Sequence, residues 1–163
     1  MAMDVHLKID TIDGESKEKG YENQIQCLSW SFGETQEASA SHGGGMGAGK
    51  VNFNDFHFTM VMCKASPKLF LHCATGQHLA NALLTVRKAG QNAQQQKLAE
   101  FKFTDLMISS YQTGGSDAST GLPVEAISFN FSKVEFEYFE QDQKGVSKSA
   151  GKAGYDLKKN TKV

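Results

Sequence analysis

The chain has 163 residues and a formal net charge of −1 at pH 7, a length that suits one domain, residues 1–163, with a single hydrophobic core. Of its 17 basic residues only Arg87 is an arginine. Because the guanidinium group is favoured for binding phosphates and base edges, this composition argues against a nucleic-acid-binding protein.

The cysteines and the N-terminal residues indicate the cellular compartment in which the protein is made. Cys27, Cys63 and Cys73 lie in apolar segments without C-x-x-C spacing, so buried free thiols and a reducing environment are expected. The sequence has no basic segment followed by an apolar one at its start, and no apolar run long enough to cross a bilayer. We therefore expect synthesis in the cytoplasm without a cleaved signal peptide, and no membrane insertion.

Alternating apolar and polar residues predict strands over residues 5–9 and about 23–32. In the second strand the large residues at positions 28, 30 and 32 are expected to face the core, whereas Ser29 and Ser31 face the other side. Residues 33–50 follow as small and polar residues without strong periodicity. A connection of this length in a compact domain predicts a long extended loop with a function of its own.

A glycine-rich stretch leads directly into a strand predicted over residues 51–62. Gly44 to Lys50 fits the G-x-x-x-x-G-K skeleton of a phosphate-binding loop. Two parts of that mechanism are missing, because Val51 has no hydroxyl for magnesium and the continuation predicts a strand where a helix is required. The sequence favours a flexible loop between two strands over a nucleotide site.

One short helix is predicted over about residues 66–75, with Ser66 as its N-cap, Pro67 in its first turn and Gly76 at its end. Further strands are expected over residues 82–88, 98–103, 106–111, 124–139 and 154–157.

The longest of these strands changes phase. Its apolar residues occupy odd positions up to Phe131 and even positions from Val134, which predicts a bulge or bend near Ser132-Lys133. Many short strands and one flanking helix predict a mainly β fold, an antiparallel barrel or sandwich.

Residue spacing indicates no catalytic or metal site. His72, Cys73, His78 and Cys63 match no metal-ligand pattern, and structural roles are the expectation. Ser29 and Ser31 lack the G-x-S-x-G context of a nucleophile. The acidic run at positions 135–142 is typical of a solvated surface. We expect no enzyme activity, no metal and no cofactor.

Taken together, several segments of this sequence resemble the haemolysin-coregulated proteins, Hcp, which are the tube subunits of bacterial type VI secretion systems. The resemblance spans the chain in order and rests on Asp4–Ile9, Gly14–Ser16, Leu28–Gly33, Gly43–Lys50, Ser66–Leu69, Leu84–Gly90, Thr113–Ser116 and Gly154–Leu157. The insert at Gln91 to Gln96 and the lysine-rich tail from Lys144 depart from the family pattern.

The resemblance implies a β-barrel with a flanking helix that assembles into hexameric rings. The rings would stack into a hollow tube, which a contractile sheath expels behind a VgrG spike and which carries effectors in its lumen. The family has no catalytic residues. We expect the glycine-rich stretch to contact a neighbouring ring through His42, Gly43, Gly44, Gly45, Met46, Gly47, Ala48, Gly49 and Lys50.

Alternation alone suggests that Ser29 and Ser31 line the polar lumen and contact cargo. A β-barrel module that binds a small ligand is the alternative interpretation. Such a module would require an apolar cavity.

Overall fold

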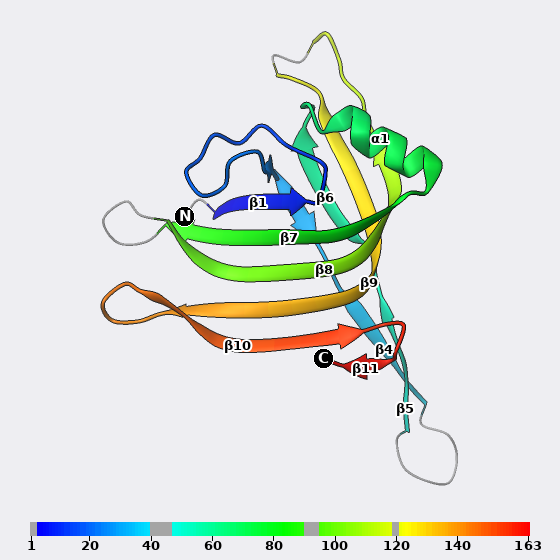
Figure 1. The fold of residues 1–163 in the computed structure, drawn as a ribbon, viewed down its shortest axis with the longest axis vertical. Helices are drawn as coiled ribbons and strands as arrows, with labels where there is room; N and C mark the ends of the chain where they lie inside the picture. The colour runs from blue at the N-terminus through cyan, green and yellow to red at the C-terminus, as the bar shows by residue number, and fades with distance from the viewer. Residues whose placement is uncertain (1–2, 40–46, 90–94, 119–120) are drawn as a thin grey trace.

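The computed structural model describes residues 3–39, 47–89, 95–118 and 121–163. Its elements, shown in Figure 1, are β1 (Met3–Ile9), β2 (Ile25–Gln26), β3 (Ser29–Ser31), β4 (Glu34–Ser39), β5 (Gly47–Phe53), β6 (Phe56–Val61), α1 (Ser66–Thr75), β7 (His78–Ala89), β8 (Gln95–Gln112), β9 (Val124–Gln141), β10 (Ser147–Asp156) and β11 (Thr161–Lys162).

Nine strands form one large sheet. Its main order is β11-β10-β9-β8-β7-β1-β2, with β6 also paired to β9 and β3 to β6. In Figure 1, β1, β7, β8, β9 and β10 run side by side across the molecule. Every strand pair among the described residues is antiparallel. The expected mainly β fold with one short helix is confirmed.

The strand β9 changes partner along its length. Residues Val124–Phe129 pair with β6, and residues Lys133–Gln141 pair with β10. Buried side chains shift from odd to even positions between Phe131 and Val134. The bend predicted near Ser132-Lys133 is therefore confirmed, and it marks the point where β9 passes from one layer of the fold to the other.

The segment that contains β2 and β3 almost closes the barrel. The Cys27 amide donates to the Val5 carbonyl at 3.0 Å, and the Leu28 amide donates to the Thr59 carbonyl at 2.8 Å. The segment thus passes from β1 to β6. The ladders of the described residues do not form a closed ring, because β2 and β3 pair with different strands and not with each other.

The prediction that residue 28 faces the core is wrong. Trp30 and Phe32 pack against the core as predicted, but Leu28 is 59% exposed. It lies where the chain crosses from one ladder to the next, so the alternation of the following strand does not extend to it.

Aromatic rings fill the space between the two layers. Phe103 is fully buried at the centre. Its ring centroid lies 5.0 Å from that of Phe56, 5.1 Å from that of Phe129 and 4.9 Å from that of Phe131. These rings come from β6, β8 and β9, so the core joins these three strands.

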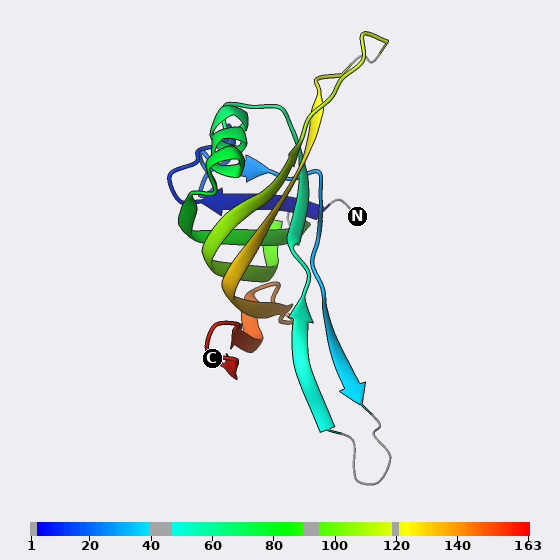
Figure 2. The ribbon, with the colours of Figure 1, turned by 90° about the vertical axis from the view of Figure 1, so that its right-hand side faces the viewer.

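The expected extension over residues 33–50 is present, but it is regular. Glu34 pairs with Phe53 and Ser39 with Gly47, so β4 and β5 form a separate two-stranded sheet, which we call the hairpin arm. The arm projects from one end of the molecule, and the connection between β8 and β9 projects from the opposite end (Figure 2). The strand predicted over residues 51–62 is divided into β5 and β6.

The helix α1 spans the predicted residues 66–75, but its N-cap is not Ser66 as predicted. Ala65 is its N-cap, and the Ser66 hydroxyl instead donates to Glu125 Oε1 at 2.5 Å and accepts from the Cys63 amide. These bonds fasten the start of the helix to β9. Gly76 ends the helix with φ 67°, as predicted.

The two strands predicted over residues 98–103 and 106–111 are one strand, β8. Asp105 lies between them with φ 56°. Its carboxylate accepts from His78 Nδ1 at 2.8 Å, from the Ser132 hydroxyl at 2.8 Å and from Lys158 Nζ at 2.6 Å. These contacts join β8 to the start of β7, to the bend in β9 and to the turn after β10.

Replacing Asp105 by Asn is expected to lower the free energy of unfolding by about 1 kcal/mol at neutral pH. The hydrogen bond from Lys158, followed by those from His78 and Ser132, holds the pKa of this carboxyl well below its usual range. Its contribution is therefore present above the unfolded pKa, about pH 4, and is lost as the pH falls towards the folded pKa.

Urea unfolding at neutral pH and at about pH 3 should show a smaller loss of stability on acidification in Asp105→Asn than in the wild type. Asp13→Asn, at an exposed position outside the strands, is the matched control and should behave as the wild type does. An unchanged acid dependence in Asp105→Asn would contradict the assignment.

Candidate functional site

Ser29 and Ser31 are exposed on β3, as predicted. The register of β3, β6, β9 and β8 aligns each serine with residues of the three other strands. Ser31 pairs with His57, which pairs with Ser128, which pairs with Ser110. Ser29 pairs with Thr59, which pairs with Ala126, which pairs with Gln112. We call this surface the serine face, and define it by Ser29, Ser31, His57, Thr59, Ser110, Gln112, Ala126 and Ser128. A depression of about 330 Å³ lies over it.

Hydroxyl groups of the serine face pair with one another across strands. The Ser29 hydroxyl lies 2.6 Å from that of Thr59, and the Ser110 hydroxyl lies 2.5 Å from that of Ser128. Because a hydroxyl both donates and accepts, Ser29, Thr59 and Ser110 keep further hydrogen-bonding capacity, whereas Ser128 is buried and also contacts the Ser109 hydroxyl at 2.8 Å. The surface therefore presents neutral donors and acceptors in a fixed arrangement.

Four of the nine predicted ring-stacking residues fall on the hairpin arm. His42 to Met46 lie outside the described residues, and Gly47 to Lys50 belong to β5. A Cβ at Gly49 would lie 2.5 Å from the Glu37 carbonyl oxygen, so only glycine allows the two strands to pair this closely. The residues after Lys50 continue as a strand, which agrees with the rejection of a nucleotide site.

The serine face and the hairpin arm meet at the base of the arm. Ser31, Gly33, Asp55 and His57 line one depression there. Phe53 of β5 packs on Tyr155 of β10, with ring centroids 5.7 Å apart. The base of the arm is thus held by the body of the fold.

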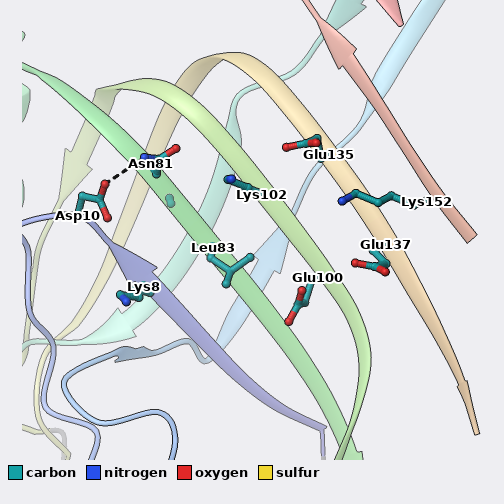
Figure 3. Close-up of a pocket in the computed structure, with 10 residues that line it drawn as sticks. Lys8, Asp10, Asn81, Leu83, Glu100, Lys102, Glu135, Glu137 and Lys152 are labelled. Atoms are coloured by element: carbon teal, nitrogen blue, oxygen red, sulfur yellow. Dashed lines mark hydrogen bonds between the residues drawn. The ribbon is translucent and has the colours of Figure 1, made fainter. Parts of the chain in front are cut away.

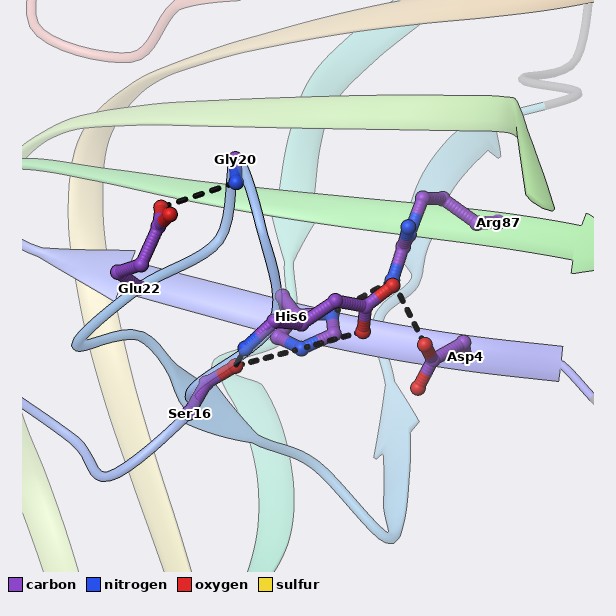
Figure 4. Close-up of polar contacts among 7 residues, drawn as sticks. Asp4, His6, Ser16, Gly20, Glu22 and Arg87 are labelled. Carbon is purple, nitrogen blue, oxygen red and sulfur yellow. Dashed lines mark hydrogen bonds and ion pairs between the residues drawn. The ribbon is translucent and has the colours of Figure 1, made fainter. Parts of the chain in front are cut away.

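A buried polar cluster was not anticipated from the sequence (Figure 4). Arg87 is 5% exposed, and its Nη2 lies 2.7 Å from Asp4 Oδ2 and 2.6 Å from Glu18 Oε1. The guanidinium carbon lies 4.0 Å from the ring centroid of Tyr21. Nearby, the buried His6 ring lies 3.2 Å from the Ser16 hydroxyl. These contacts hold residues 13–24 against β1 and β7.

The carboxylates of the cluster are paired with the guanidinium of Arg87. Asp4, His6 and Glu18 bring their ligand atoms within 4.8 Å of one another, a grouping that could hold an ion. The guanidinium of Arg87 already neutralises both carboxylates, and its hydrogen bond lowers the pKa of Glu18. Burial lowers the pKa of His6.

The described structure does not bring together the histidines and cysteines that were weighed as metal ligands from the sequence, which are His72, Cys73, His78 and Cys63. His72 donates from Nδ1 to the Lys68 carbonyl at 2.8 Å, whereas His78 contacts Asp105. The described residues do not group these two histidines with Cys63 or Cys73 as metal ligands. In the described part of the chain each histidine ring instead bonds a protein oxygen, that of Lys68 or that of Asp105.

A charged groove of about 400 Å³ lies on the outward side of β1, β7, β8, β9 and β10 (Figure 3). Its charged residues are Lys8, Asp10, Glu100, Lys102, Glu135, Glu137 and Lys152. Glu100 and Lys102 alternate along β8 with the core residues Phe101 and Phe103, just as His57 alternates along β6 with Phe56 and Phe58. The charged groove and the serine face therefore lie on opposite sides of one aromatic core.

Comparison with known proteins agrees with this architecture. Residues 6–138 match a family described as "Type VI secretion system effector, Hcp". The chain belongs to the Hcp family. It is 38% identical over 165 residues to Protein hcp1 of Pseudomonas aeruginosa, and the alignment covers 100% of both chains.

Solved structures of Hcp proteins share the fold. One described as a type six secretion system protein superposes with a TM-score of 0.92 at 30% identity, covering 99% of this chain and 100% of the other. Hcp1 from Salmonella typhimurium superposes with a TM-score of 0.80 at 36% identity, covering 100% of both chains. The expected assignment as a type VI secretion tube subunit is confirmed at the level of the family.

Family membership also bears on assembly and export. Hcp proteins are oligomerising components of type VI secretion, and the family is structural. The single helix among the described residues is too short and too polar to traverse a membrane.

Proposed function

We propose that residues 1–163 act as one domain that assembles into hexameric rings, and that these rings stack into a hollow, exported tube. The observation that carries this proposal is the hairpin arm, a two-stranded sheet that stands apart from the body. An isolated hairpin in water is marginally stable. Its exposed edges call for a partner, and a second copy of the chain supplies one when a heterologous interface closes into a ring.

In this proposal the arm contacts the adjacent ring through residues 42–50. Its position at one end of the long axis supports this role, because an arm directed along a tube axis reaches the next ring. Glu34 to Glu37 and Lys50 are exposed along the arm. A contact of this kind is polar at its edges and joins copies by backbone pairing.

The serine face would line the lumen, where Ser29 and Ser31 contact effectors. The tube would be tipped by a VgrG spike and driven by a contractile sheath, the partners that the family resemblance implies. The chain would be made in the bacterial cytoplasm and leave through the type VI machinery, without catalysis, a cofactor, nucleic acid or membrane insertion. The alternative ligand module is less well supported, because aromatic side chains fill the core.

Ring and tube formation can be tested separately. Native mass measurement of the purified chain should give a sixfold mass, and negative-stain images should show rings. Gly49→Ala places a Cβ 2.5 Å from the Glu37 carbonyl oxygen, so it should separate β4 from β5 and prevent rings from stacking.

Gly151→Ala is the matched control, since a Cβ there meets nothing within 4 Å. It should form rings and tubes as the wild type does. A strictly monomeric wild-type protein at every concentration would contradict the ring, and normal stacking by Gly49→Ala would contradict the role of the arm.

A further inference from the structure

His6 is a buried histidine on the outward side of β1. The core residues of this strand occupy odd positions, so alternation directs His6 to the opposite side of the sheet. The exposed fraction of His6 is nonetheless 0%. Residues 13–24 lie between the ring and water. Their contacts with it are the Ser16 hydroxyl at 3.2 Å, Glu18 Oε2 at 3.6 Å and the ring of Tyr21 at 4.9 Å between centroids.

The position of Arg87 fixes where the neutral ring carries its proton. Nδ1 of His6 lies 3.5 Å from Arg87 Nη2, and a guanidinium nitrogen donates but does not accept. The neutral ring therefore turns its unprotonated nitrogen towards Arg87 and keeps its proton on Nε2, which donates to the Ser16 hydroxyl. A second proton on Nδ1 would face a donor and place two cations side by side.

The charges around the ring act in both directions. Figure 4 shows the side chains of Asp4, Ser16 and Arg87 converging on His6. Burial lowers the pKa of His6, and the charge of Arg87 acts in the same direction, whereas the carboxylates of Asp4 and Glu18 oppose it. Both carboxylates already bind Arg87, at 2.7 and 2.6 Å. The hydrogen bond from Arg87 lowers the pKa of Glu18, so Glu18 stays ionised over the range in which a histidine titrates.

We propose that His6 is a pH-sensitive latch for residues 13–24, closed while its ring is neutral and opened when the ring is protonated. A charged ring gains hydration when the segment that covers it lifts away, and a buried charge without its own partner is costly. Lifting also carries Glu18 and Tyr21 away from Arg87, so the ion pair and the stacking on Tyr21 are lost in the same step.

The latch reaches beyond the segment itself. Residues 13–24 lead directly into β2, the strand at the end of the main sheet order. The chain then crosses from β1 to β6 through the amides of Cys27 and Leu28. Opening of the latch therefore loosens the place where the barrel is almost closed.

The direction of the pH dependence follows from linkage. A histidine whose pKa is lowered in the closed state takes up a proton more readily once the segment is open. Its contribution to closure is complete above its ordinary pKa, about 6.5, and is lost as the pH falls from there towards the lowered value. Over that interval each pH unit changes the opening equilibrium by about tenfold.

Two exchange measurements by mass spectrometry test the latch on the full chain, in whatever assembly it forms. Exchange of the carbon-bound imidazole hydrogen reports protonation of His6 as the pH is varied. Amide exchange, corrected for the intrinsic effect of pH on its rate, reports opening of the segment. From about pH 7.5 to about pH 5.5, protection of residues 13–24 should fall about tenfold, and protection of β8 and β9 should not.

Two variants locate the effect. His6→Gln keeps a side chain that donates and accepts but does not titrate, so its protection of residues 13–24 should be the same at both pH values. His57→Gln, at an exposed histidine of β6, is the matched control and should respond to pH as the wild type does. Should His6→Gln fail to fold, the two wild-type measurements decide alone, because protonation of His6 and loss of protection must follow one pH curve.

Three results would overturn the inference. The first is unchanged protection of residues 13–24 in the wild type at both pH values. The second is an equal loss of protection in His6→Gln. The third is a His6 ring that becomes protonated while the segment keeps its protection. None of these results depends on ring formation, so the latch and the proposed function stand or fall separately.

Discussion

Phe103→Ala is expected to lower the free energy of unfolding by about 4 kcal/mol. Phe103 is fully buried and its ring lies within 5.1 Å of the rings of Phe56, Phe129 and Phe131, centroid to centroid. Removal of the ring loses its burial and leaves a cavity, and the three strands around it have little freedom to collapse because they are hydrogen-bonded to one another.

Urea unfolding monitored by circular dichroism measures the effect, with the same slope expected for both proteins if unfolding stays two-state. Phe70→Ala is the matched control. Phe70 is 59% exposed on α1 and makes one edge contact with Tyr111 at 6.1 Å between ring centroids, so its loss should cost about 1 kcal/mol or less. Equal destabilisation by the two variants would show that Phe103 does not anchor the core.

The layers of the fold could be predicted from alternation along the chain. Phe103 and its neighbours in sequence show the period of two that marks a strand with one face buried. The change of phase between Phe131 and Val134 predicted the bend in β9 because a strand can reverse its buried face only by a bulge or bend. Local pattern is sufficient for both features.

The hairpin arm was missed as regular structure for a physical reason. Residues 34–37 are exposed polar residues without hydrophobic alternation, whereas residues 51–53 were already predicted as part of a strand. Their pairing depends on backbone hydrogen bonds and on a close approach at Gly49. The division of β8 at Asp105 was an error of the opposite kind, because a polar residue resembled a turn although its carboxylate joins three neighbouring segments.

Only some residues of the serine face could be predicted from the sequence. Alternation placed Ser29 and Ser31 on the outward side of their strand, but it could not name His57, Ser110 or Ser128. These residues join the serine face through the register of β6, β9 and β8, and register is set by the packing of the buried side chains. The cluster around Arg87 was invisible for the same reason, since its members come together only when the sheet forms.

Arg87→Ala is expected to lower the free energy of unfolding by about 3 kcal/mol and to release residues 13–24 from the sheet. The guanidinium contacts the carboxylates of Asp4 and Glu18 and stacks on Tyr21. Removing it leaves two neighbouring carboxylates beside the buried His6 without a cation. The carboxylates keep partial contact with water, at 25% and 35% side-chain exposure, which places the effect at the lower end of the range for broken buried pairs.

Hydrogen exchange separates local release from general weakening. In Arg87→Ala the amides of Gly14, Ser16 and Asn23, which bond within this segment, should exchange much faster relative to those of β8 and β9 than in the wild type. Arg87→Lys retains the charge but not the planar fork or the stacking on Tyr21, so it should recover only part of the loss. Full recovery by lysine would show that charge alone holds the segment, and unchanged exchange in Arg87→Ala would show that the turn at residues 13–24 is held by its own backbone bonds.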